Sequence, residues 1–219
     1  MRLITKGNPA NESAAAFDHL YKDRNTHGQS TLSHSLVAEK FYNLASEFYE
    51  YGWGESFHFG YRAAHQHHAV QAANAQAFVA QKLRVANLDR VLDLGCGIGG
   101  PLRGIVARTG ANVTGVTINE HPAARGREVT ARLTPWMQER CHYVVSDYLD
   151  MHALETGAYD AAFFMESTLH VEDREAAFRE AYRLLKPGGR VVGMEYVTLD
   201  GWDERDPELR RLMQMHSHG

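Results

Sequence analysis

Apolar residues between positions 35 and 84 recur with the period of an α-helix, in two separate runs. In the first run they lie three or four residues apart, which predicts an amphipathic helix that ends at Gly52. These residues are Val37, Phe41, Leu44, Phe48 and Tyr51. A second helix is expected over residues 62–84, with Val70, Ala73, Ala77 and Ala80 on one side. Residues 1–30 are polar and lack a period, so we expect a loosely held arm there.

Beyond residue 90, short apolar runs alternate with helical patterns. Strands are expected at residues 91–94, 112–118, 141–146, 159–165 and 190–197, and helices at residues 101–108, 122–136 and 173–185. The last helix should be closed by residues 186–189, Lys-Pro-Gly-Gly, as a helix stop and turn. Continuous apolar strands separated by helices predict an α/β fold, with a doubly wound, mostly parallel sheet of the Rossmann-like kind.

The first predicted strand runs directly into a glycine-rich turn. Asp93 stands at the strand end, and Gly95, Cys96 and Gly97 follow it. Glycine tolerates positive φ and lets a ligand approach the main chain closely. The spacing Gly95-x-Gly97-x-Gly99 is not the dinucleotide pattern, although Gly100 completes a degenerate match to it. Asp93 discriminates between the two, because a carboxylate there can hold an ammonium group rather than a pyrophosphate. S-adenosylmethionine (SAM) carries such an ammonium and no phosphate. We therefore predict a SAM site, the alternative being a structural turn without a ligand.

The next two strand ends supply further candidates for the cofactor site, because ligands of such folds bind beyond the carboxyl ends of the strands. Thr117 and Ile118 stand where a Rossmann oxidoreductase would carry an acidic residue for the ribose, and a hydroxyl can still bind a diol. Asp147 could accept the exocyclic amine of an adenine, and Tyr148 could stack on its ring. The alternative for Asp147 is the cap of a helix or turn.

Two residues after the fourth strand are candidates for the reaction itself. Glu166 follows a hydrophobic run, and a carboxylate so placed acts either as an acid or base or as a stabiliser of a cation. His170 could be another base, or it could cap a helix that begins near Val171.

Composition excludes several classes of protein. The formal net charge of −4 and the absence of a basic run argue against a nucleic-acid surface. With 2 cysteines there is no disulfide framework, so we expect reduced thiols and a cytoplasmic protein. No apolar run approaches the roughly 18 residues of a membrane span. Although His65, His67 and His68 lie close together, adjacent helical histidines point in different directions, so no metal site is predicted.

Several segments together resemble a known family. Residues 49–59, 91–103 and 184–189 look like the signature segments of the sterol 24-C-methyltransferases. Residues 165–170 are similar to that family's Glu-Ala-Thr-Cys-His segment, with Leu169 in place of its cysteine, and the likeness extends over residues 35–212. The glycine turn and the Lys-Pro-Gly-Gly segment are shared by class I SAM-dependent methyltransferases at large. Relatives of the aromatic segment 49–59 occur in bacterial methyltransferases that act on isoprenoid, tocopherol and sugar substrates.

The resemblance implies an enzyme that adds a methyl group from SAM to an alkene carbon of an isoprenoid, either a sterol side chain or a smaller terpenoid. The carbocation so formed would lie among aromatic faces, Tyr51 and Trp53 among them, before Glu166 or His170 removes a proton. Tyr42 is implied to reach the SAM carboxylate with its hydroxyl. Residues 117–119 depart from the Asn-rich run of the sterol enzymes, which weakens the assignment to sterols in particular.

Two alternatives stay open at this point. One is a natural-product O- or N-methyltransferase in which His170 deprotonates the substrate. The other is a catalytically silent SAM-fold module that serves assembly. Asp93 with its glycine turn, together with Glu166, argues against silence.

The predicted organisation has three parts. Residues 1–60 form an arm and a helical, aromatic cap, residues 61–200 the SAM-binding α/β domain, and residues 201–219 the start of a substrate-covering segment. Class I methyltransferases continue into two further antiparallel strands and a lid, which are missing from this sequence, so we expect the natural protein to continue past Gly219. A sheet that ends at the fifth strand would have an open edge, so we also expect a homo-oligomer with a lipophilic small-molecule substrate.

Overall fold

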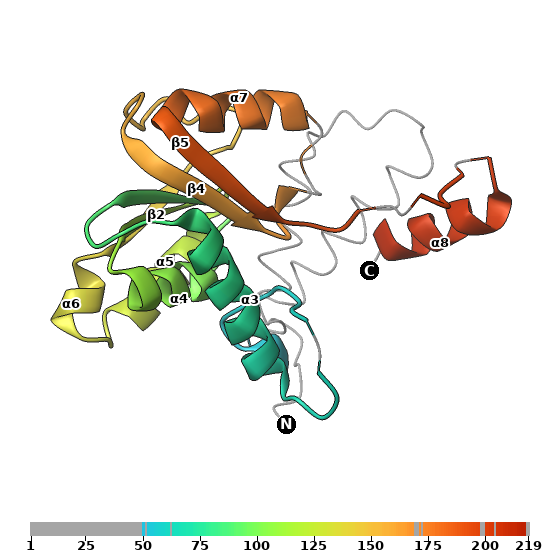
Figure 1. Cartoon of the computed structure of the whole chain (residues 1–219), viewed down its shortest axis with the longest axis horizontal. Helices are drawn as coiled ribbons and strands as arrows, with labels where there is room; N and C mark the ends of the chain where they lie inside the picture. The colour runs from blue at the N-terminus through green and yellow to red at the C-terminus, as the bar shows by residue number, and fades with distance from the viewer. Residues whose placement is uncertain are drawn as a thin grey trace, which may run out of the picture.

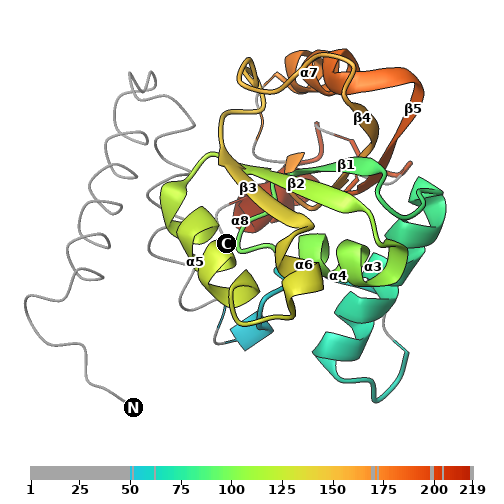
Figure 2. The same ribbon diagram turned by 90° about the vertical axis from the view of Figure 1, so that its left-hand side faces the viewer.

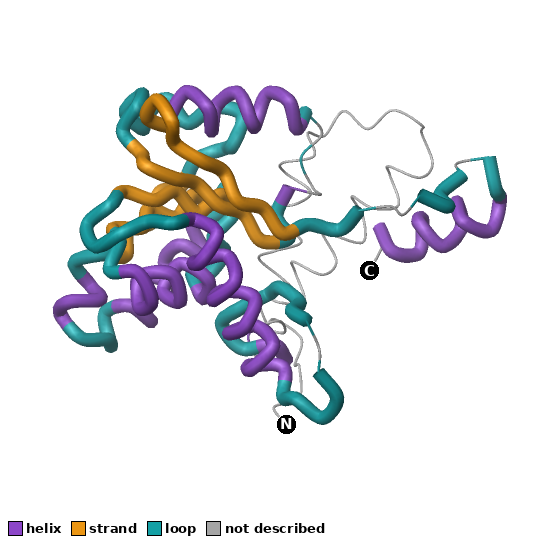
Figure 3. Tube along the Cα trace, viewed as in Figure 1, coloured by secondary structure: helices purple, strands orange, loops and turns teal. Residues whose placement is uncertain are grey.

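The computed structural model describes residues 50, 52–61, 63–168, 171, 173–197, 200–203 and 205–217. Within them are the five strands that the hydrophobic pattern predicts, separated by helices except between β3 and β4 (Figures 1 and 3). In chain order the elements are α3 (His68–Leu83), β1 (Arg90–Leu94), α4 (Gly100–Thr109), β2 (Asn112–Thr117), α5 (Glu120–Thr130), α6 (Pro135–Gln138), β3 (Cys141–Val145), β4 (Tyr159–Met165), α7 (Arg174–Leu184), β5 (Leu185–Met194) and α8 (Pro207–Ser217). None of the helices in this part of the chain is long and apolar enough to cross a membrane.

The five strands form one parallel sheet in the order β3-β2-β1-β4-β5. Parallel neighbours need a crossover between them, which the helices supply. The order reverses at β1, which pairs with β2 on one side and β4 on the other. Folds of this kind bind ligands at such a reversal, beyond the carboxyl ends of the strands. The Rossmann-like prediction is therefore confirmed, and the ends of β1 and β4 are the place to examine.

Two hydrophobic clusters cover the two faces of the sheet. On one face α3 and α4 pack on the sheet through Val79, Leu83 and Leu102, against Val91 and Phe163. On the other face α7 contributes Ala181 and Leu184, which pack with neighbouring strand residues such as Leu92 and Phe164. Figure 2 shows α7 on one side of the sheet and α3, α4, α5 and α6 on the other. Since side chains alternate along a strand, successive residues of β1 enter different clusters.

The buried side of α3 differs from the predicted one. Val70 is 46% exposed and Ala77 is also exposed, whereas the buried side runs through Gln71, Ala72, Ala75, Gln76, Val79, Ala80 and Leu83. The reason is that two polar side chains are buried on this side of α3, where each forms a hydrogen bond within the protein. The amide of Gln71 donates to the Gln66 carbonyl at 3.0 Å, and that of Gln76 donates to Ser56 Oγ at 2.9 Å. A count of apolar positions alone misses this face.

Two predicted boundaries are also wrong. Residues 122–136 form two helices rather than one, because Pro135 cannot continue α5 and instead begins α6 with Thr134 as its N-cap. The Lys-Pro-Gly-Gly segment ends α7 as expected, but it lies within β5 rather than before it. Tyr159 pairs with Leu185 and Ala161 with Arg190, so Asp160 alone faces residues 186–189 of β5, which bulge outward.

Candidate active site

The carboxylate of Asp93 lies at the centre of the carboxyl edge of the sheet. Asp93 pairs with Gly115 of β2 and with Phe163 of β4, and its residue is only 2% exposed. Its Oδ2 is buried and has no hydrogen-bond partner among the described residues. Burial raises the pKa of this carboxyl well above its usual range. A buried polar atom without a partner is costly, so Asp93 is suited to a cationic or hydrogen-bonding ligand.

The glycine turn after Asp93 is held to β2 by hydrogen bonds and has open space beside Gly97. The N–H groups of Gly95 and Cys96 both donate to the Val116 carbonyl, at 2.9 and 3.0 Å. A Cβ at Gly95 would collide with the Tyr148 hydroxyl and with Ser167. At Gly97, whose φ is +51°, a Cβ would meet nothing within 4 Å. The open position beside an unpaired carboxylate fits the aminoacyl part of SAM.

Cys96 contributes to this turn through its backbone. Its side chain is buried in the cluster beneath α4, and its Sγ lies 2.6 Å from where a Cβ of Gly115 would stand. Burial, followed by the nearby charge of Asp93, raises the pKa of the thiol well above its usual range. The thiol therefore stays protonated and fills space, because a thiolate is disfavoured there.

The second and third strand ends lie next to this turn. Thr117 is buried at the end of β2, Ile118 is half-buried, and Asn119 caps α5 by accepting from the His121 N–H at 2.9 Å. Asp147 Oδ1 accepts from the Leu149 N–H at 2.9 Å, so Asp147 does cap a turn, as the alternative proposed. Tyr148 is half-buried with its hydroxyl against Gly95, which brings the third strand end to the glycine turn.

Glu166 follows β4 and is held in an unusual conformation. Its φ is +54°, a left-handed backbone that costs a residue other than glycine about 1–2 kcal/mol. Its Oε1 accepts from the Phe59 N–H at 3.0 Å, and the Tyr196 hydroxyl also hydrogen-bonds the carboxylate. Burial raises the pKa of Glu166, and these two hydrogen bonds counteract part of that rise. Strain of this kind is typical of functional sites.

The neighbouring residues brace Glu166 against β1 and β5. Ser167 Oγ donates to the Leu94 carbonyl at 2.6 Å, which ties the end of β4 to the end of β1. The Thr168 backbone N–H and hydroxyl both donate to Glu195 Oε2, at 2.8 and 2.7 Å. The Glu166 carboxylate and the glycine turn are thereby fixed on adjacent strands.

A cluster of aromatic rings lies beside Glu166, because Phe59 and Tyr196 both hydrogen-bond its carboxylate. The rings of Trp53 and Phe59 meet edge to face with centroids 6.1 Å apart, and Phe59 meets Tyr196 in the same way at 6.2 Å. Trp53 also contacts the ring of His68, at 5.9 Å. Trp53 is 39% exposed and Phe59 52% exposed, so neither ring is fully buried in the core. We call these three rings, Trp53, Phe59 and Tyr196, the aromatic rim; it places apolar surface and electron-rich ring faces next to the carboxylate.

A buried polar network fixes this aromatic segment, which we define as residues 52–61, against α3. His58 is 1% exposed, and its Nδ1 donates to the Phe59 carbonyl at 2.8 Å, while its Nε2 accepts from the Gln76 amide at 3.2 Å. Burial lowers the pKa of His58, which favours this neutral tautomer. A Cβ at Gly60 would collide with the Gln71 carbonyl oxygen, so the segment lies directly on the helix backbone.

Three predicted site residues, Tyr42, Tyr51 and His170, lie outside the described residues. The helix expected near Val171 begins at Arg174 as α7, with Asp173 as its N-cap. Within the described part of the chain, no group of three or more His, Cys, Asp or Glu could hold a metal ion. Sequence reasoning missed Tyr196, because the predicted fifth strand, residues 190–197, contained it, whereas β5 ends at Met194.

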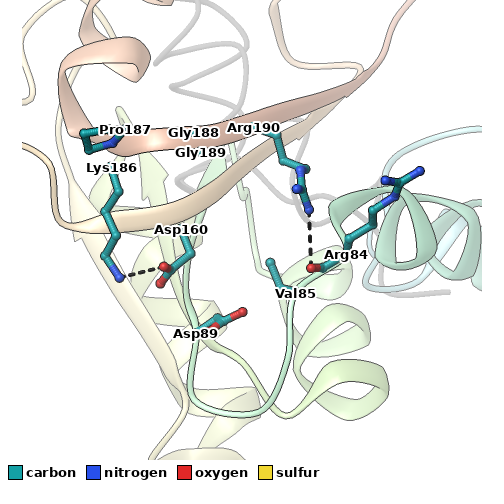
Figure 4. Close-up of a pocket in the computed structure, with 9 residues that line it drawn as sticks. All are labelled: Arg84, Val85, Asp89, Asp160, Lys186, Pro187, Gly188, Gly189 and Arg190. Atoms are coloured by element: carbon teal, nitrogen blue, oxygen red, sulfur yellow. Dashed lines mark hydrogen bonds and ion pairs between the residues drawn. The ribbon is translucent and has the colours of Figure 1, made fainter.

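A cavity of about 230 Å³ lies at the opposite end of the sheet (Figure 4). Three of its charged groups have partners within the protein: Lys186 Nζ lies 2.6 Å from Asp160 Oδ1, and Arg190 donates to the Leu83 carbonyl at 3.0 Å. It is formed by the amino ends of β4 and β5, where parallel α/β folds do not bind their ligands. The candidate active site is therefore the carboxyl edge.

The sequence of this chain is similar to those of known methyltransferases. Residues 92–193 match the family model described as a methyltransferase domain. The sterol 24-C-methyltransferase of Saccharomyces cerevisiae is 32% identical over 190 residues, covering 87% of this chain and 49% of the relative. The cycloartenol-C-24-methyltransferase of Arabidopsis thaliana is 37% identical over 176 residues, covering 80% and 52%. The chain thus spans about half the length of these curated relatives.

A solved structure matches the same fold. Geranyl diphosphate methyltransferase, in complex with GPP and sinefungin, superposes with a TM-score of 0.72 at 22% identity. The match covers 85% of this chain and 74% of that chain. At this identity the likeness bears on the fold alone.

Proposed function

Because this chain carries a methyltransferase domain over residues 92–193, we propose that it is a SAM-dependent C-methyltransferase acting on an alkene carbon of an isoprenoid. The single observation that carries the proposal is a strained, partly buried Glu166 set among aromatic rings beside the glycine turn of Asp93. A hydroxyl or amine substrate would not need such a rim. An alkene does, because its methylation leaves a cation.

On the cofactor side, the residues suit the aminoacyl end of SAM, which supplies an electrophilic methyl group when bound. The unpaired Oδ2 of Asp93 would receive the ammonium, and the open face at Gly97 leaves room for the chain next to it. Thr117 and Asp147 stand at the two strand ends where the ribose and adenine would lie, with Tyr148 between Asp147 and the turn. We propose that Thr117 binds the ribose, that Asp147 accepts from the adenine amine and that Tyr148 stacks on the adenine ring.

On the substrate side, the aromatic rim would stabilise positive charge without forming a bond to it. Each desolvated ring contributes about 0.5–2 kcal/mol to a cation held over its face. Trp53, Phe59 and Tyr196 form this rim, and two of them hydrogen-bond the carboxylate. The ionised Glu166 would add a charge of opposite sign and then accept the proton whose loss ends the reaction.

The relatives support the substrate class at a coarse level. Two of them are named for methylation of a sterol at carbon 24, and both are more than 30% identical to this chain. The chain shares its fold with an enzyme named for geranyl diphosphate. An isoprenoid alkene is the chemistry common to these names, and it agrees with a rim of rings rather than a pair of acid–base groups.

The test is a screen of the 219-residue protein with methyl-labelled SAM and three substrate classes: sterols with an unsaturated side chain, prenyl diphosphates and prenylated indoles. We expect label to enter one class as a new carbon–carbon bond, located by NMR of the product. A product that proves to be an ether or a methylamine would overturn the proposal in favour of O- or N-methylation.

A further inference from the structure

One buried guanidinium joins the cofactor turn to the aromatic segment. The side chain of Arg103, in the first turns of α4, is 7% exposed. Its Nη1 donates to the Ile98 carbonyl at 2.7 Å and to the Tyr143 hydroxyl at 2.8 Å, and its Nη2 donates to Glu55 Oε2 at 2.8 Å. These partners come from the glycine turn, from β3 and from the aromatic segment.

Two of these contacts join the glycine turn to the aromatic segment. Ile98 lies next to Gly97, so its carbonyl belongs to the turn that would face the cofactor. Glu55 belongs to the same segment as Trp53 and Phe59, and a Cβ at Gly100 would collide with the Glu55 carbonyl oxygen. The segment therefore crosses directly over the beginning of α4.

The third partner anchors the guanidinium to the sheet. Besides accepting from Arg103, the Tyr143 hydroxyl lies 3.0 Å from Thr130 Oγ1 of α5. Burial raises the pKa of Tyr143 to about 12, so the phenol stays neutral and does not balance the charge of Arg103. Glu55, whose side chain is 47% exposed, is the carboxylate that does.

Only arginine suits this junction. Its planar fork presents several N–H donors at fixed angles and stays charged when buried, whereas lysine offers a compact ammonium on a flexible stem. A lysine at this position keeps the charge but cannot donate to all three partners in these directions. Such a change separates the geometry of the junction from its charge.

We infer that Arg103 is a positioning residue for methyl transfer, one that sets the aromatic segment relative to the cofactor turn so that occupancy of one is felt at the other. This inference rests on the proposed function for its kinetic consequence. The coupling itself can be measured without turnover. Linkage requires the coupling free energy to be reciprocal. If binding of a cofactor analogue shifts the aromatic segment to a new conformation, that conformation must raise the affinity for the analogue by the same free energy.

The experiment uses Trp53 as a reporter in the 219-residue chain, with its other tryptophans replaced (Trp136→Phe, Trp202→Phe). S-adenosylhomocysteine (SAH) is titrated, with its affinity measured by calorimetry and the Trp53 emission recorded in parallel. In this parent protein we expect SAH to bind and to change the Trp53 emission.

Two variants then break the junction from opposite sides. With Arg103→Lys, SAH affinity should fall by about tenfold, since a hydrogen bond to a charged group is lost, and the emission change should shrink. With Glu55→Gln, on the exposed side, both changes should have the same direction and be smaller: affinity should fall by about twofold, and the emission change should shrink less than in Arg103→Lys. Arg108→Lys is the matched control on α4, because Arg108 contacts the carbonyls of Gly104 and Ala73 and not the turn, and it should leave both readouts unchanged.

Turnover gives a further readout. Glu55→Gln should lower kcat for the substrate found in the screen and leave KM for SAM within about twofold. Normal SAH binding with no change of Trp53 emission in the parent overturns the inference and leaves the proposed function standing. So does an emission change that Arg103→Lys and Glu55→Gln both retain. A parent protein that does not bind SAH overturns the inference and the proposed function together.

Discussion

At the scale of single residues, the buried carboxylate of Asp93 lowers the stability of the ligand-free protein, although it suits the binding of a cationic ligand. Its raised pKa means that ionisation above about pH 4, the ordinary range of a carboxyl, opposes folding of the ligand-free protein. Stability from this group is present below that range and is lost as pH rises through its folded pKa. Asp93→Asn should therefore raise the free energy of unfolding at pH 7 by about 1–3 kcal/mol, with a gain that vanishes near pH 3. Thermal unfolding across that range checks it, and a variant less stable than wild type at pH 7 would contradict it.

Tyr196 adjusts the pKa of Glu166 through a hydrogen bond. Its hydroxyl hydrogen-bonds the Glu166 carboxylate and lowers a pKa that burial and the charge of Glu195 raise. Removing the hydroxyl in Tyr196→Phe should raise the pKa of Glu166. If Glu166 accepts the proton, the acid limb of the profile of kcat against pH should move to higher pH, while SAH affinity stays constant. Glu166→Gln should remove that limb and lower kcat. An acid limb that does not move in Tyr196→Phe would remove Glu166 from the role of base.

Glu166 itself could be found in the sequence, because it follows a recognisable buried strand. Its partners could not be found there. Phe59 is 107 residues away from it in the chain, and only the folded sheet brings the two together. Tyr196 lies beyond the last strand and has no motif of its own. Asp147 had two possible roles in the sequence, and the contact with the Leu149 N–H shows one of them, the turn cap.

At the scale of elements, the fit of the aromatic segment on α3 depends on a glycine. Gly60→Ala would drive a Cβ into the Gln71 carbonyl oxygen, which is backbone and cannot yield easily. We expect the segment to shift away from Glu166 and kcat to fall by about tenfold or more, since misplaced catalytic groups are costly, with little change in SAH affinity. Gly52→Ala is the control, because a Cβ there meets nothing within 4 Å. Equal kinetics in the two variants would show that this packing does not position the site.

The elements also show where a hydrophobic pattern suffices. Strand β4 is buried on both faces, so its predicted bounds, residues 159–165, match Tyr159–Met165. The pattern fails on α3, because Gln71 and Gln76 are buried through hydrogen bonds that no periodicity records. It also fails at residues 186–189, since a bulge and a turn need the same proline and glycines.

At the scale of the whole molecule, β5 is an edge of the sheet. Among the described residues it pairs only with β4, and Val191 is 41% exposed. An apolar edge promotes pairing with another chain. We expect the 219-residue protein to self-associate as its concentration rises, and Val191→Lys to weaken that association without changing SAH affinity. Size-exclusion chromatography with light scattering measures both. A monomer at every concentration would show that this edge is tolerated.

The central claim is that the carboxyl edge at β1 and β4 is a SAM site organised around Asp93. Calorimetry of SAH binding tests it most directly, with Asp93→Ala beside Asp160→Asn, whose carboxylate pairs with Lys186 at the opposite end of the sheet. We predict that wild type and Asp160→Asn bind SAH with the same affinity, and that Asp93→Ala shows no measurable binding. An Asp93→Ala variant that binds SAH as tightly as wild type would contradict the account.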